Sequence, residues 1–129
     1  MLAMVAAARE SVCLESYMVR PGEPAESLLR ALVGACQRGV RVQVLYDAFG
    51  SEGLPAGFFV PLRAAGGAVR VFSPARRLRL AFRDHRKLLV CDARCAIVGG
   101  HNIAPEYMGD GLTRGWRDLA LRIEGPVAA

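Results

Sequence analysis

Apolar residues along this chain follow two different periods, and glycines mark where one period gives way to the other. Between residues 25 and 38, Leu28, Leu32 and Cys36 recur at helical spacing, and Gly39 follows as a stop. Residues 40–46 then alternate apolar and polar side chains, which is typical of a strand. Residues 56–65, Gly66-Gly67 and residues 68–72 repeat this order of helix, glycine and strand. The repetition predicts βαβ units with right-handed crossovers in a parallel or mixed sheet.

The same reasoning assigns the rest of the chain. We expect a short helix over 2–10, a strand over 11–19, a strand over 86–92 joined by a tight turn to 95–98, a helical turn over 104–108 and a last strand over 116–124. The strand at 86–92 is apolar on both faces after its first residues, which is typical of a central strand. No linker, repeat or low-complexity segment interrupts the 129 residues, so we expect a single domain over 1–129.

Composition and charge narrow the classes of partner. The chain is 53% hydrophobic, yet no apolar run approaches the ~20 residues of a membrane span. The net charge of +5 suits anionic partners such as nucleic acid, acidic lipid headgroups or phosphates, and it equally fits a solvated basic surface. Residues 73–84 are basic and partly apolar. They form either a solvated loop or a cationic rim for an anionic amphiphile.

The four cysteines, Cys13, Cys36, Cys91 and Cys95, include no Cys-x-x-Cys pair. Buried free thiols in a reducing compartment are expected. Zinc-finger spacing is absent, and no cluster of carboxylates in the sequence suits magnesium or calcium, so we expect neither a metal nor a cofactor.

Reactive residues concentrate at the start of the strand over 86–92. His85 and Lys87 are two residues apart and therefore share a face of the strand. An imidazole can attack phosphorus or shuttle a proton, and the ammonium can neutralise a phosphate oxygen. Asn102 offers amide donors, and Gly99 and Gly100 allow backbone to approach a ligand. Together they predict a phosphodiester site that needs no metal.

Two aspartates are candidates for supporting roles. Asp118 is the candidate acceptor for the second nitrogen of His85, because its strand could run beside that of His85; alternatively it is a strand-end residue that faces solvent. Asp92 borders a turn, where aspartate bonds nearby backbone, so we favour a structural role over direct catalysis.

Four further side chains are candidates to line the site. Ser51 follows Gly50 and could touch the phosphate, although a turn serine is an equal alternative. Glu15 and Tyr17 share a strand face and could line the pocket, or belong to a half-buried strand. His101 more plausibly lines the pocket or faces solvent than takes part in the chemistry.

The composite pattern resembles a known signature. His85-x-Lys87, four residues, Asp92, six residues and Gly99-Gly100-x-Asn102 resemble the HKD motif of the phospholipase D superfamily. Almost the whole chain is similar to the first catalytic half of bacterial cardiolipin synthases. The further matching segments are Glu15-Ser16-Tyr17, residues 38–42, Asp47 with Gly50-Ser51, Asp84 to Lys87, Ile103, Trp116-Arg117-Asp118 and Gly125-Pro126.

The resemblance implies a three-layer α-β-α sandwich with a mixed, largely parallel sheet. It implies a metal-independent phosphatidyltransferase in which one histidine attacks phosphorus, giving a phosphohistidine, and a second HKD histidine protonates the leaving alcohol. Carried over, His85 is a catalytic histidine, Lys87 and Asn102 bind phosphate, and Asp118 orients His85. The donor would be a phosphatidyl lipid and the acceptor commonly phosphatidylglycerol, at the cytoplasmic face of an anionic membrane or in the cytoplasm.

The chain departs from that pattern in carrying one HKD motif where the family's site needs two. It is therefore interpreted as one half of a longer enzyme, with negligible activity as an isolated monomer. The alternatives are a homodimeric metal-independent phosphodiesterase or nuclease of the same superfamily, for which nucleic acid would be the partner, and a non-catalytic module that binds anionic lipid.

Overall fold

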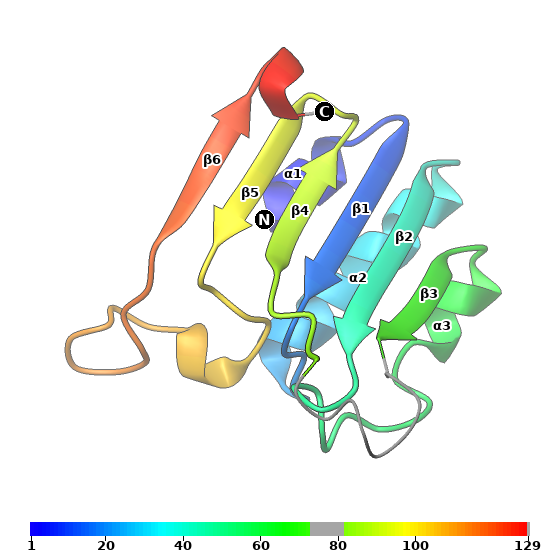
Figure 1. Ribbon diagram of the computed structural model, residues 1–129. Helices are drawn as coiled ribbons and strands as arrows, with labels where there is room; N and C mark the ends of the chain where they lie inside the picture. Colours follow the sequence, from blue (N-terminus) through cyan, green and yellow to red (C-terminus); the bar gives the residue numbers. More distant parts are fainter. Residues whose placement is uncertain (73–81, 129) are drawn as a thin grey trace.

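The computed structural model describes residues 1–72 and 82–128. Within these ranges the chain forms one sheet of six strands, three α-helices and two short 3-10 helices (Figure 1). The helices are α1 (Leu2–Ala7), α2 (Glu23–Gln37), α3 (Val60–Ala64), η2 (Pro105–Tyr107) and η3 (Pro126–Ala128). The strands are β1 (Ser11–Ser16), β2 (Arg41–Asp47), β3 (Ala68–Phe72), β4 (Lys87–Cys91), β5 (Cys95–Gly99) and β6 (Ala120–Glu124).

The strands lie in the order β3-β2-β1-β4-β5-β6. The predicted α/β class and mixed sheet are confirmed, but "largely parallel" is wrong. Only β1–β2 and β2–β3 are parallel, while β1–β4, β4–β5 and β5–β6 are antiparallel. The reason is local: α2 and α3 serve as crossovers between parallel strands, whereas a tight hairpin turn between β4 and β5 can join only antiparallel strands.

The expected third layer is not formed by the described helices. α1, α2 and α3 all lie behind the sheet in Figure 1 and cover one face. Both βαβ crossovers step in the same direction, from β1 to β2 to β3, and right-handed crossovers that step the same way place their helices on the same face. The core lies between these helices and the sheet, and its fully buried members include Val5, Val12, Leu32, Leu62 and Leu89.

Helix α2 is the main cover of the sheet and begins and ends at recognisable signals. Pro24 lies in its first turn, where the missing N–H costs no hydrogen bond. Leu28 and Leu32 lie on its buried face. Gly39, just after the helix, has φ +84°, a left-handed conformation that glycine adopts without strain. The chain then enters β2 directly.

The opposite face of the sheet carries apolar residues that the described helices leave uncovered. Register places Leu88 opposite Val98, and Val98 opposite Leu121. Val98 is 39% exposed and Leu121 68% exposed. Cys13 is exposed on the same face, so the expectation that all four thiols are buried is wrong for this residue.

Four predicted elements are shorter than expected by three residues or more. The helix over 2–10 ends at Ala7, the strand over 11–19 ends at Ser16, the helix over 56–65 keeps only Val60–Ala64, and the strand over 116–124 begins at Ala120. Within the described ranges, no helix combines the length and the apolar character needed to cross a membrane.

Candidate active site

Four strand ends meet at one edge of the sheet. Ser16 at the end of β1 is paired with Lys87 at the start of β4, and Gly99 at the end of β5 is paired with Ala120 at the start of β6. The segments that carry Tyr17, His85, Asn102 and Asp118 directly continue or precede these ends. The topology therefore brings residues from four distant parts of the sequence to a single edge.

His85 and Lys87 contact each other at this edge, as the shared strand face predicts. Lys87 Nζ lies 2.9 Å from His85 Nδ1 and donates to the His85 carbonyl at 2.7 Å. Tyr17 packs beside both: its ring centroid is 4.3 Å from that of His85, and Lys87 Nζ lies 5.1 Å above its ring. The exposed imidazole thus has one side against an aromatic ring and the other open.

The ammonium of Lys87 is partly withdrawn from water. Desolvation lowers the pKa of Lys87 below its usual range, and the carboxylates of Asp118 and Asp84 act in the opposite direction. Asp118 is therefore close enough to influence the site electrostatically. A desolvated ammonium interacts strongly with an anion, because water screens it less.

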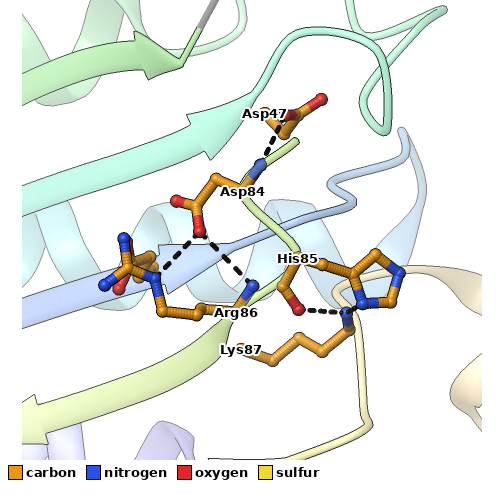
Figure 2. A network of polar contacts seen from close by, with 6 residues as sticks. Asp47, Asp84, His85, Arg86 and Lys87 are labelled. Atoms are coloured by element: carbon orange, nitrogen blue, oxygen red, sulfur yellow. Dashed lines mark hydrogen bonds and ion pairs between the residues drawn. The ribbon is translucent and has the colours of Figure 1, made fainter. Parts of the chain in front are cut away.

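A chain of polar contacts holds the backbone on either side of His85 (Figure 2). The buried Asp47 accepts the N–H of Asp84 through Oδ2 at 3.0 Å, and the N–H groups of Phe49 and Gly50 through Oδ1 at 2.9 and 3.0 Å. The buried Asp84 in turn accepts Arg86 Nε at 3.0 Å. Both neighbours of His85 are thereby fixed.

Glu15 joins this network from β1. Its Oε1 lies 3.0 Å from Arg86 Nη2. Burial raises the pKa of Glu15, and the adjacent Asp84 carboxyl raises it further. For Asp84 burial acts in the same direction, but the neighbouring Glu15 carboxyl and the hydrogen bonds and charge of Arg86 outweigh it and lower the pKa. The described contact of Glu15 is thus an ion pair, and its predicted contact with a phosphate remains a prediction.

Asn102 lies at the far side of the same edge. Its Oδ1 accepts the N–H of Met18 at 3.1 Å, and its Nδ2 donates to the Tyr107 hydroxyl at 2.7 Å. The amide has a second N–H, and its predicted contact with a phosphate remains a prediction. Tyr107 also packs against Trp116, with ring centroids 5.3 Å apart. Sequence reasoning missed Tyr107, although an aromatic hydroxyl five residues after Asn102, across one helical turn, was a usable signal.

Asp118 reaches the site by a different route from the one predicted. Strand β5 separates β6 from β4, so the expectation that its strand runs beside that of His85 is wrong. β6 begins at Ala120, where its pairing with Gly99 of β5 begins. Asp118 therefore lies two residues before the strand and not within it. The carboxylate lies over Gly100, where any Cβ would overlap it. Gly99 is equally enclosed, by the backbone of Leu119 and Ala120.

Ser51 and Asp92 make contacts with backbone. The buried Ser51 hydroxyl accepts the N–H of Val19 at 3.0 Å, so its contact with a phosphate stays a prediction. Asp92 accepts the N–H groups of Arg9, Glu10 and Ser11 at 3.0, 2.8 and 2.9 Å. This agrees with a structural role for Asp92, but the backbone it bonds is distant in sequence rather than local.

Sequence reasoning gave Asp47 and Asp84 no role beyond their place in the motif match. The signal for both was an aspartate at the boundary of an apolar strand, where a carboxylate can receive several backbone N–H groups. Within the described ranges, no three His, Cys, Asp or Glu side chains gather as a metal site. The basic residues Arg76, Arg77 and Arg79 of the expected cationic rim lie outside the described residues.

Comparisons with known proteins agree on one family. The model of the family "Cardiolipin synthase, PLD-like domain", where PLD denotes phospholipase D, matches residues 1–127. The chain is 39% identical to the major cardiolipin synthase ClsA of Bacillus subtilis over 97% of its own length and 27% of that protein. It is 38% identical to cardiolipin synthase B of Salmonella typhi, again over 97% of its length and 32% of that protein. The chain therefore spans about a third or less of these relatives.

A solved structure shares the fold. The phospholipase D family member Nuc from Salmonella typhimurium superposes with a TM-score of 0.69 over 98% of this chain and 76% of Nuc, at 21% identity. The agreement extends to a mixed sheet flanked by helices.

Proposed function

Because the chain belongs to the cardiolipin synthase family of phospholipase D-like domains, we propose that it forms one half of a phosphatidyltransferase site that acts on phospholipid phosphodiesters. The observation that carries the proposal is the meeting of His85, Lys87 and Asn102 at one edge of the sheet, in a chain with cardiolipin synthase relatives. The second half would come from a longer polypeptide or from another chain, and would supply a second histidine.

The proposed reaction has two steps. In the first, the lone pair of one histidine attacks phosphorus, a P–N bond forms, and the P–O bond to the leaving alcohol breaks. The other histidine gives that alcohol its proton. In the second, an acceptor alcohol loses its proton to that same histidine and attacks phosphorus, so that the P–N bond breaks and a new P–O bond forms. Lys87 and Asn102 would hold the phosphate oxygens as charge builds.

The partner of His85 Nδ1 would decide which of these roles His85 takes. When Lys87 Nζ donates a hydrogen bond to Nδ1, the contact made at 2.9 Å, the neutral ring carries its proton on Nε2 and has no lone pair there, so this contact does not suit a nucleophile. A carboxylate accepting from Nδ1–H frees the Nε2 lone pair and suits a nucleophile. Asp118 would supply that carboxylate once a phosphate draws Lys87 away, which gives the orienting role proposed for Asp118 a physical basis.

The proposed location is peripheral, at an anionic membrane on its cytoplasmic side. The net charge of +5 and the phospholipid chemistry of the relatives support it. The acceptor would be phosphatidylglycerol or a related alcohol.

The test is reconstitution. The chain is incubated with phosphatidylglycerol vesicles alone, and then with the second-half segment of the Bacillus subtilis relative. We expect cardiolipin only from the mixture, loss of product with His85→Ala, and no change with Glu26→Ala on the exposed face of α2. Labelled phosphatidylglycerol quenched in base separates the roles, because an acid-labile phosphohistidine on this chain identifies His85 as nucleophile. A mixture that makes cardiolipin equally well with His85→Ala would exclude the proposal.

A second candidate is a homodimeric, metal-independent phosphodiesterase. It is favoured by one observation: the chain spans 76% of Nuc but only 27% of ClsA. Light scattering followed by a plasmid-nicking assay in chelator tests it. A monomer that leaves DNA intact rules it out, and a dimer that nicks DNA makes it the better description.

A further inference from the structure

An open cavity of about 580 Å³ lies beside the candidate active site, on the helix-covered side of the sheet. α1, the first turn of α2, β5, the start of β6 and residues 101–108 enclose it. Its volume is within the range of roughly 300–1,000 Å³ typical of small-molecule sites. Most of its wall is apolar, including Ala3 of α1, Leu28 of α2, Ile97 of β5, Ile103 and Ala120.

The cavity neighbours a smaller space that Lys87 lines. A narrow space of about 20 Å³ beside Lys87 and Ser16 has in its wall Ile97, His101 and Ile103, which also line the large cavity. The shared wall means that the two spaces adjoin. A ligand with a phosphate at Lys87 therefore has an apolar volume nearby.

His101 stands at the junction of the two spaces. Its Nδ1 is buried and makes no hydrogen bond with any residue of the described chain. Its ring packs loosely against Tyr107, with centroids 5.9 Å apart. A buried polar nitrogen without a partner is costly unless something binds it. Asn102 and Tyr107 also line the cavity and add polar groups close to His101 in the sequence.

We propose that this cavity receives one acyl chain of the phospholipid substrate, with His101 donating from Nδ1–H to the ester carbonyl. The assignment rests on the proposed function, which puts the phosphate at His85 and Lys87. A phospholipid has its phosphate, ester and alkyl chain in that order, and the structure offers Lys87, His101 and the apolar walls in the same order.

Neighbouring residues of β6 provide a matched pair of variants. Ala120 is exposed and lines the cavity, whereas Leu121 is 68% exposed on the opposite face of the sheet. Ala120→Phe fills the cavity, and Leu121→Phe adds a similar ring outside it. Ala3→Leu fills the cavity from α1 and serves if Ala120→Phe does not fold.

The probes are lysophosphatidylglycerols with hexanoyl or palmitoyl chains, below their micelle concentrations, titrated into the chain by calorimetry. We expect the palmitoyl lipid to bind at least about tenfold more tightly than the hexanoyl lipid, because added methylenes enter an apolar site. Ala120→Phe should remove this chain-length preference while Leu121→Phe keeps it. Equal binding of both lipids by the native chain, or equal effects of the two variants, would overturn the proposal.

A second pair of probes tests His101. The ether analogue of the palmitoyl lipid lacks the carbonyl and should bind the native chain a few-fold more weakly, whereas His101→Ala should not distinguish ester from ether. A His101→Ala variant that keeps the full ester preference rejects the assigned contact. These measurements need no turnover. Chain-length preference without cardiolipin synthesis would reject only the proposed function, and synthesis without that preference would reject only the acyl site.

Discussion

Asp47 Oδ2 accepts the backbone N–H of Asp84 at 3.0 Å across 37 residues of sequence. The bond joins the last residue of β2 to the segment immediately before His85. Because Asp47 is 1% exposed, no water replaces this bond if it is lost. The position of the candidate catalytic histidine therefore depends on a carboxylate in a different strand.

Asp47→Asn should destabilise the fold by about 1–3 kcal/mol, because an amide can accept on only one side and its NH₂ group would face a backbone N–H. Urea unfolding followed by circular dichroism measures the change. Glu52→Gln, at an exposed position in the loop after β2, is the control. Its free energy of unfolding should stay within about 0.5 kcal/mol of that of the native chain. Equal stabilities of the two variants would contradict the proposed importance of the bond.

Asp92 should make stability depend on pH. Burial tends to raise the pKa of Asp92, but the N–H groups of Ser11, Glu10 and Arg9 outweigh it and lower that pKa in the folded chain. A carboxylate with a lowered folded pKa stabilises the protein above its unfolded pKa of about 4 and loses that contribution as pH falls through the folded value. The difference in unfolding free energy between the native chain and Asp92→Asn should therefore be largest near neutral pH and shrink below about pH 4. A difference that does not change with pH would mean that the charge is not what these N–H groups bind.

Asp118→Asn should lower the pKa of Lys87 further. Desolvation already lowers it, and Asp118 is the larger of the two charges that oppose the shift. Removing that charge makes the ammonium less favourable, so the titration should move to lower pH. Lys87 is the chain's only lysine, so its side-chain NMR signals can be assigned without ambiguity. Asp110→Asn, in the exposed loop after η2, is the control and should leave the titration in place.

Gly100→Ala should displace Asp118. A Cβ at Gly100 would overlap the Asp118 carboxylate, and overpacking of this kind typically costs about 1–3 kcal/mol. Thermal unfolding measures the cost, and the Lys87 titration should shift in the same direction as in Asp118→Asn. Gly57→Ala, where the nearest atom to a new Cβ is 4.0 Å away, should change neither.

The thiols should react in a defined order. Burial is the main cause that raises the pKa of Cys91 to about 11, whereas Cys13 is exposed on the uncovered face of the sheet. Only the thiolate reacts, so alkylation at pH 8 should reach Cys13 at least about tenfold faster than Cys91. Peptide mass spectrometry over time gives both rates, and Cys13→Ser should remove the fast phase. Comparable rates at Cys13 and Cys91 would mean that this end of β4 opens readily.

Most elements could be predicted because their patterns are local. The period-two alternation of 68–72 gives β3 with its observed bounds, and the tight turn at 93–94 gives the β4–β5 hairpin. The motif gave His85, Lys87 and Asn102, and the strand geometry that brings His85 and Lys87 together follows from their spacing alone.

The errors concern relationships between distant segments. No local pattern encodes that β6 lies next to β5 rather than β4. Nor does any local pattern encode the direction of each crossover, which places all three α-helices on one face of the sheet. Asp47 was missed for the same reason, because its importance comes from Asp84, 37 residues away, which the fold brings to it. Tyr107 is different, since it bonds Asn102 only five residues away and the local spacing was a usable signal.

The central position of β1 has a consequence for synthesis on the ribosome. β1 is made before one of its two neighbours, β4, which begins only at Lys87. Until that segment emerges, β1 and β2 present an unpaired strand edge of apolar residues, and such an edge is prone to pair with other chains. The nascent chain should therefore be most vulnerable to aggregation after β2 has formed and before the segment that carries His85 and Lys87 closes that edge.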